Sequence, residues 1–366
     1  MQVAPDGPSN ASVAYVTMEP GELEQRRMLN LVGPSGCKFW WMAGAEGMPA
    51  RALADGEAHG PAQLDGKRAW VGNVFASPTG KEKPPASMVA ESAQSWLLPR
   101  LPRTARVIVA IGREATLALA TGKLASRRQS IEAHCASVIP AAQCAGFIRP
   151  PTGSVVIPMR HPSALLRGSD EWYPSSRLAL RRAALVLRGM LPAPPPRREQ
   201  LFAVREQAAT VLRAATSSGA VSIDLETTRD ASEILIGGFC VDEQVWVFDA
   251  HDTLYVASLL FANPSIRVDG QNHVTFDLPR LAERGVRWPA GGVRDTRWMD
   301  GKLRPRMPHN LAHMAAHWLP WAPPNWKHLS DGVSVFSEQG RRYCGLDAWY
   351  TWHLARVMEE QFEQAA

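Results

Sequence analysis

Apolar positions in the second half of the chain fall into short runs and into helical repeats. A turn at Asp242 joins two of the short runs as a hairpin. The predicted strands are residues 220–225, 233–241 and 244–250. The predicted helices are residues 200–217, 277–284, 310–318 and 348–366. Strands followed mostly by helices predict a mixed sheet packed between helices.

The first half gives fainter signals of the same kind. Residues 106–111 form an apolar strand, Gly112 supplies a turn, and residues 113–120 continue as a helix. A second apolar run begins at Val155, and residues 176–187 are predicted to be helical. A strand, a glycine turn and a helix make up an α/β unit. We therefore predict the α/β fold class, in two domains.

A proline-rich segment separates the two halves. The sequence LPAPPPRR begins at Leu191, and its three consecutive prolines cannot continue a helix and favour an extended connector. The predicted parts are a poorly structured N-terminus (residues 1–27), a first domain (28–190), a linker (191–199) and a second domain (200–366).

Composition narrows the class of protein. Of 366 residues, 45% are apolar and 20% are charged, as in ordinary globular proteins. No long apolar stretch or signal peptide is visible in the sequence, so we expect no membrane partner and a cytoplasmic location, in a bacterial or phage-infected cell. Five scattered cysteines without a C-x-x-C pair favour free thiols. A net charge of +5 is compatible with a polyanionic partner or with an arginine-rich background.

Acidic residues carry the main chemical signal. Asp224 and Glu226 are one residue apart in the sequence VSIDLETT, so a strand directs both to the same face. Like charges there destabilise the strand unless a cation lies between them. Asp277 begins a predicted helix, and Tyr343 and Asp347 are one helical turn apart. This donor set suits two Mg²⁺ or Mn²⁺ ions about 4 Å apart, which prefer oxygen ligands.

The order of these motifs carries a resemblance. A strand with D-x-E-T, then GQN…FDL, then D-T…HNL, then Y-x-x-x-D, resembles the tyrosine subgroup of DEDD 3′–5′ exonucleases, above all the proofreading domain of family A DNA polymerases. The resemblance covers the second domain and implies a ribonuclease H-like sheet. It implies that Asp224 bridges two ions and that Glu226 and Asp347 complete the tighter site. It further implies that Asp277 holds the second ion and that Tyr343 positions the attacking water.

The sequence departs from this family at one loop. The family has three residues between its asparagine and the second aspartate, whereas four separate Asn272 from Asp277 here. Either His273 takes the place of the asparagine, or the loop carries one extra residue. Asn272 is a possible DNA contact.

The first domain carries a second resemblance. In this order, GNV…P…KP, VIVAIG and HPSALL resemble the uracil-DNA glycosylase superfamily, most closely its iron–sulfur type, which is also fused to some phage DNA polymerases. This implies a parallel sheet between helices. It implies that Asn73 reads the edge of a flipped uracil and that His161 stabilises the uracil anion. A domain that keeps this fold and only binds DNA is the alternative.

Two features of the first domain depart from that type. Ala76 stands where a cluster cysteine is expected, so we expect no iron–sulfur cluster. The family's water-activating G-E-A-P-G loop should follow the first strand. After residues 38–43, read as that strand, only GAEG follows, in which Glu46 is a candidate substitute in a shifted register. The sequence GEAHG at residues 56–60 is closer letter by letter, but it lacks an apolar strand before it and is too close to Asn73.

Basic residues suggest one further contact. The predicted helix that precedes the linker contains no acidic residue and carries Arg177, Arg181 and Arg182. They are either a solvated helix face or possible contacts for DNA phosphates.

These observations predict a DNA enzyme. We expect a metal-dependent 3′–5′ exonuclease of proofreading or repair type that acts on the 3′ end of single-stranded DNA, beside a uracil-glycosylase-like domain. A separate DNA polymerase subunit is a possible partner. One alternative is trimming of RNA. The other is a non-catalytic DNA-binding module of a replication complex.

Overall fold

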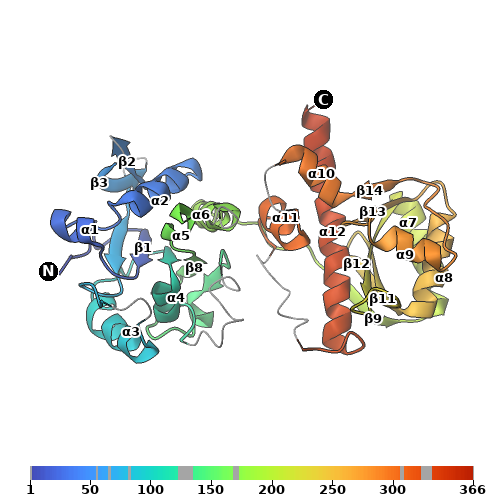
Figure 1. Cartoon of the computed structure of the whole chain (residues 1–366), viewed down its shortest axis with the longest axis horizontal. Coiled ribbons are helices and arrows are strands. Elements are labelled where there is room, and N and C mark those ends of the chain that lie inside the picture. The colour runs from blue at the N-terminus through green and yellow to red at the C-terminus, as the bar shows by residue number, and fades with distance from the viewer. Residues whose placement is uncertain are drawn as a thin grey trace. The chain divides into compact units, whose positions relative to one another are not determined.

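The chain forms two compact units, Met1–Leu191 and Pro192–Ala366, each of which is described by itself (Figure 1). The computed structural model describes residues 2–54, 57–64, 67–80, 84–122, 135–167, 173–305, 309–322 and 332–365. The α/β architecture of both units confirms the predicted fold class. Within the described residues, none of the helices combines the length and the apolarity that a bilayer span requires.

The first unit is built on a mainly parallel sheet with the strand order β5-β1-β6-β8-β7. Its strands are β1 (Val13–Thr17), β5 (Trp70–Asn73), β6 (Val107–Ile111), β7 (Ile139–Pro140) and β8 (Val155–Met159). Only β7 runs antiparallel to its neighbour. A separate antiparallel sheet contains β2 (Ala50–Ala54), β3 (Glu57–Leu64) and β4 (Lys67–Arg68).

Helices complete the first unit. They are α1 (Glu22–Arg27), α2 (Pro34–Ala45), α3 (Ala86–Ser92), the π-helix η1 (Ala93–Leu97), α4 (Arg113–Leu119), the 3₁₀ helix η3 (Ala141–Gln143), α5 (Ser163–Leu166) and α6 (Tyr173–Leu187). The predicted strand, turn and helix around Gly112 are present as β6 and α4, and Gly112 has a φ of 91° that favours glycine.

The expectation of a poorly structured N-terminus is wrong. All of β1 is buried, and it lies between β5 and β6 in the sheet. The segment before it is also bound, because Asp6 pairs with Val71, and Val3 N–H donates to the carbonyl of Ala76 at 2.8 Å. The short apolar run of β1 is flanked by polar and small residues, so its place in the sheet depends on partners distant in sequence.

Residues 38–43 are also not a strand. They lie inside α2, which starts with the helix-favouring sequence Gly33-Pro34. Phe39 and Trp40 are buried on this helix, so the apolar run reflects a buried helical segment. Periodicity alone does not distinguish such a segment from a buried strand.

The second unit contains a mixed sheet with the strand order β14-β13-β10-β11-β12-β9. Its strands are β9 (Arg198–Ala203), β10 (Ala220–Thr227), β11 (Ile234–Val241), β12 (Gln244–Asp249), β13 (Arg267–Gly270) and β14 (Val293–Asp295). β10 runs antiparallel to β11 and parallel to β13. The predicted hairpin is β11 and β12, and Asp242 in its turn has a φ of 53°.

The helices of the second unit cover both faces of this sheet. They are the 3₁₀ helix η5 (Arg205–Gln207), α7 (Ala208–Ser218), α8 (Ala250–Phe261), α9 (Asp277–Glu283), α10 (Thr296–Leu303), α11 (Leu311–Trp318) and α12 (Glu338–Ala365). The single helix predicted for residues 200–217 is wrong at its start, because β9 pairs with β12 as an edge strand and α7 follows. The last predicted helix begins earlier than residue 348, at Glu338.

Two adjacent glycines let helices approach both faces of β11. Successive residues of a strand face opposite sides. A Cβ at Gly237 would lie 2.4 Å from Thr253 of α8, and a Cβ at Gly238 would lie 2.8 Å from the carbonyl oxygen of Cys344 in α12. α8 and α12 therefore lie on opposite faces, and Figure 1 shows α12 running along the sheet.

Candidate active site

Strand β10 places two carboxylates on the face that α12 covers. Asp224 lies opposite Gly238 in β11, and Glu226 lies opposite Ile236. Paired residues of neighbouring strands share a face, and Gly238 faces α12. Both acidic side chains of β10 therefore point toward the helix, as their spacing along the strand requires.

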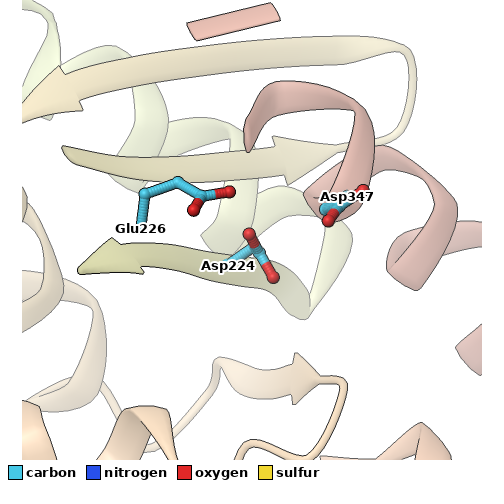
Figure 2. A group of neighbouring side chains, drawn as sticks. All are labelled: Asp224, Glu226 and Asp347. Carbon is cyan, nitrogen blue, oxygen red and sulfur yellow. The ribbon is translucent and has the colours of Figure 1, made fainter. Parts of the chain in front are cut away.

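Helix α12 brings a third carboxylate to the same place. The hydroxyl of Ser222 donates to the carbonyl of Ala348 at 2.7 Å and so joins β10 to α12 beside the site. Carboxylate oxygens of Asp224, Glu226 and Asp347 lie within 4.8 Å of one another. Figure 2 shows the three side chains meeting from the strand and the helix.

The charges of this cluster repel one another. Burial raises the pKa of Asp224 well above its ordinary value, and the charges of Asp347, Glu226 and Asp277 raise it further. The three grouped ligands are all carboxylate oxygens, and their repulsion is relieved by a cation. The donor set therefore fits Mg²⁺ or Mn²⁺.

Tyr343 lies beside these carboxylates on α12. Burial is the first cause that raises the pKa of its phenol, followed by the charges of Asp347, Asp224 and Glu226 and by a hydrogen bond that the phenol donates to Asp347. The hydroxyl therefore stays protonated at neutral pH. A protonated hydroxyl both donates and accepts, which suits it to orient a water molecule.

Asp277 enters the site from the first residue of α9. It is 3% exposed, and burial raises its pKa, while a hydrogen bond from His273 opposes that shift. His273 Nδ1 lies 3.1 Å from Asp277 Oδ2. Asp277 lies outside the group of three, but its charge acts on Asp224.

The loop before α9 explains why four residues, and not three, separate Asn272 from Asp277. His273, not Asn272, makes the hydrogen bond to Asp277. Asn272 has a φ of 60°, and its side-chain oxygen accepts from Thr275 and from Arg297, each at 2.7 Å. The histidine thus stands next to the carboxylate, and the asparagine is turned toward α10. A DNA contact by Asn272 stays a prediction.

Two residues of this loop region have a role that the sequence does not predict. In the sequence, His273 is only a possible replacement for the asparagine, and Asp295 only begins the D-T…HNL segment. Asp295 caps α10 and accepts backbone hydrogen bonds from Asn272, Val274 and Arg297, each at 3.0 Å. The signal available in the sequence was Asp-Thr directly before a helix, which is an N-cap pattern.

The first unit holds a cavity of about 1020 Å³. Thr17 at the end of β1, Gly112 after β6 and His161 after β8 all line it. These strands are parallel, so their carboxyl ends meet at one edge of the sheet, where α/β folds commonly bind ligands. Thr17 is 1% exposed, and its hydroxyl has no hydrogen-bond partner among the described residues.

Of the two residues predicted to bind uracil, His161 lines this cavity and Asn73 does not. His161 lines the cavity, and burial lowers its pKa to about 4, with a smaller effect from Arg167, so the ring is neutral. Asn73 does not line the cavity and is buried, opposite Thr17 in the sheet. Its Nδ2 donates to Asn30 at 2.5 Å, and its Oδ1 has no partner among the described residues.

The first strand of the sheet is β1, so the position of the water-activating loop is directly after β1 and not after residues 38–43. Thr17 ends the strand, and Met18-Glu19-Pro20-Gly21 follows it. When Pro20-Gly21 is matched to the last two residues of G-E-A-P-G, Met18 stands at the position of the glutamate. Glu19 is shifted by one residue and accepts from the backbone N–H of Thr79 at 2.6 Å. Glu46 is not the substitute, because it forms an ion pair with Arg177 at the end of α2.

Family models match both units. A model described as 3′–5′ exonuclease matches residues 201–363. The second unit is therefore similar to 3′–5′ exonuclease domains. A model of the uracil-DNA glycosylase superfamily matches residues 4–185, so a glycosylase-like domain precedes the exonuclease domain. Both resemblances inferred from the sequence are confirmed. No curated protein matched the chain.

Solved structures that are similar to the chain each cover just under half of it. The catalytic core of RRP6 from Trypanosoma brucei is 17% identical with a TM-score of 0.37, over 46% of this chain and 50% of that chain. NrnC of Brucella melitensis is 20% identical with a TM-score of 0.36, over 46% of this chain and 82% of that chain. RNase D of Escherichia coli, an exoribonuclease, is 16% identical with a TM-score of 0.37, over 45% and 46%.

The three arginines of helix α6 that were predicted to contact DNA phosphates differ in their exposure and in their partners. Arg182 is 3% exposed and donates to the carbonyl of Ala136 at 2.9 Å, so its role as a phosphate contact is wrong. Arg177 is paired with Glu46. Arg181 is exposed and stays a predicted contact.

Proposed function

We propose that the exonuclease domain removes nucleotides one at a time from the 3′ end of DNA, with Mg²⁺ or Mn²⁺ as its cofactor. The convergence of Asp224, Glu226 and Asp347 within 4.8 Å carries this proposal. Asp277 and Tyr343 lie beside them and complete the set that hydrolysis of a phosphodiester by two metal ions needs.

Each residue has a proposed role that follows from its position. Asp224, Glu226 and Asp347 would hold one ion, and Asp277 together with Asp224 would hold the second. When bound, the ions stabilise charge on the phosphate and lower the pKa of a coordinated water. Tyr343 donates to Asp347 and orients the attacking water toward the phosphorus.

Two observations favour DNA over RNA. The sequence motifs are most similar to a DNA proofreading domain, and the neighbouring unit matches a superfamily that acts on DNA bases. A single-stranded 3′ end, as a proofreading or repair step would supply, is the proposed substrate, and a separate DNA polymerase subunit is the proposed partner. We place this activity in the cytoplasm.

Parallel substrates test the proposal. DNA and RNA strands of one sequence, labelled at the 5′ end, are incubated with the protein and Mg²⁺. We expect a ladder that shortens from the 3′ end, faster for DNA than for RNA. Faster shortening of RNA would replace the proposed substrate with RNA and leave the chemistry intact.

For the glycosylase-like domain, we propose DNA binding without excision of uracil. Met18 stands at the position of the water-activating glutamate, and the carboxylates of Glu19 and Glu24 are bound to backbone N–H groups. A side chain that already accepts such bonds is less available to activate water. The cavity keeps a neutral histidine and an unpartnered buried hydroxyl, which suit binding of a polar ligand.

A uracil-containing duplex tests this second proposal. EDTA silences the exonuclease, so strand breaks after alkali report only abasic sites. We expect retained duplex binding and no alkali-sensitive site at uracil. Excision of uracil that is lost in His161→Ala would show that this domain is an active glycosylase.

A further inference from the structure

We propose that His273 and Asp295 form a positioning pair that orients Asp277 toward the second metal ion. The inference rests on the proposed nuclease function. Neither residue belongs to the carboxylate set. The pair acts through the loop between β13 and α9, whose geometry the chain fixes at several points.

Asp295 fixes the path of this loop. It is 5% exposed, and its Oδ1 accepts from the backbone N–H of Asn272 while its Oδ2 accepts from that of Val274, each at 3.0 Å. These bonds hold the two residues on either side of His273. They also stabilise the left-handed φ of 60° at Asn272, which is an unusual conformation outside glycine.

His273 connects that loop to α9 at two atoms. Its carbonyl oxygen accepts from the N–H of Leu278 at 3.0 Å, and its Nδ1 lies 3.1 Å from Asp277 Oδ2. Among the described residues, no other group donates a hydrogen bond to Asp277. The Nδ1–H bond therefore fixes the rotation of the carboxylate and leaves Oδ1 as a free ligand.

Gly270 provides the space for this arrangement. A Cβ at Gly270 would lie 2.2 Å from the Cβ and Cγ atoms of His273, so a larger residue would displace the imidazole. The ring is fully buried. Its Nε2 has no partner among the described residues, so only one of its two nitrogens is used, and that one faces Asp277.

His273→Leu affects both nitrogens of the ring. It removes the unpartnered Nε2, which costs little, but it also leaves the buried carboxylate of Asp277 without its donor. We therefore expect a lower melting temperature in EDTA, which His273→Asn should restore in part because it keeps a donor. A positioning role predicts that the same variant binds metal more weakly, since loss of such partners typically costs 10- to 100-fold in affinity or activity.

The test measures metal binding without turnover. Binding of Mn²⁺ to the full chain without DNA is followed by electron paramagnetic resonance, and half-activation by Mg²⁺ is measured with labelled DNA. In His273→Leu we expect weaker binding of one Mn²⁺ ion and at least a tenfold higher half-activating Mg²⁺ concentration, with a KM for DNA near wild type. His273→Asn, which restores a donor, should recover part of both.

Asp295→Asn provides an independent variant. It keeps the size of the side chain and removes one acceptor. We therefore expect Mn²⁺ binding that is weaker than in the wild type, but less weakened than in His273→Leu. Wild-type Mn²⁺ binding in both His273→Leu and Asp295→Asn would overturn the proposal. An inactive wild type would instead reject the nuclease function, and Mn²⁺ binding would still report on the pair.

Discussion

Gly238 and Cys344 set how closely α12 lies on the sheet. A Cβ at Gly238 would be 2.8 Å from the carbonyl oxygen of Cys344 and 3.1 Å from its sulfur. Gly238 is also the partner of Asp224 across the β10–β11 ladder. The glycine that admits the helix thus lies beside the first carboxylate, and Asp347 follows Cys344 by one helical turn.

Replacement of this glycine should damage the site more than the fold. In Gly238→Ala the added methyl must move α12 outward, which carries Asp347 away from Asp224. We expect a loss of about 1–3 kcal/mol in stability and at least a tenfold rise in the half-activating Mg²⁺ concentration. Thermal unfolding and a Mg²⁺ titration measure the two effects. Gly285→Ala is unsuitable as a control because Gly285 has a φ of 83°. Gly301→Ala in α10 is suitable, because a Cβ there would lie 4.0 Å from His309 Nε2, an ordinary contact distance.

Metal binding should stabilise the exonuclease domain. Burial and then the charges of the neighbouring carboxylates raise the pKa of Asp224, and a cation relieves this repulsion in the folded state. We expect Mg²⁺ to raise the melting temperature by about 2–4 °C per kcal/mol of binding free energy. Asp224→Ala should abolish the rise, and Glu283→Ala, at an exposed position in α9, should retain it. An unchanged rise in Asp224→Ala would contradict the site.

Tyr343 should matter for turnover and not for metal binding. Tyr343→Phe removes the hydroxyl that donates to Asp347 and keeps the ring. We expect kcat to fall about 100-fold, with the Mg²⁺-induced rise in melting temperature intact. Single-turnover kinetics and thermal unfolding separate the two. A variant as fast as the wild type would remove Tyr343 from the mechanism.

His161 should make the glycosylase-like domain sensitive to acid. Its pKa is about 4 in the folded chain against 6.5 ordinarily, because burial disfavours the charged ring. Between these values the unfolded chain binds more protons, so stability falls as the pH drops from 6.5 to 4. In His161→Gln we expect a smaller drop in melting temperature over this range. His251, whose side chain is 81% exposed, provides the matched control as His251→Gln, and an equal drop in both variants would contradict the assignment.

The sequence was most informative where chemistry and local pattern coincide. The alternation of Asp224 and Glu226 predicted their shared face, and the helical spacing of Tyr343 and Asp347 predicted their common turn. The structure shows both. What brings the two pairs together is the close packing at Gly238, which depends on a tertiary contact that no local pattern encodes.

The errors have the same physical origin. β1 and β9 are short strands whose place is set by pairing with β6 and β12, so their local sequences indicated an unstructured end and a helix. The apolar stretch of α2 lacks a clear period because most of the helix is buried or half-buried. Similarly, the apolar residues 38–43 resemble a first strand, so the sequence does not point to the loop at Met18. The role of His273 is not visible in the sequence because it depends on a hydrogen bond formed by the loop.

The central claim is that the carboxylates of β10, α9 and α12 support hydrolysis from a 3′ end. Its most direct test is a single-turnover reaction on a 5′-labelled DNA strand with Mg²⁺, using wild type and Asp224→Ala. The account predicts stepwise shortening from the 3′ end by the wild type, loss of that activity in EDTA, and none in Asp224→Ala. No shortening by the wild type with either Mg²⁺ or Mn²⁺, or equal shortening by Asp224→Ala, would contradict it.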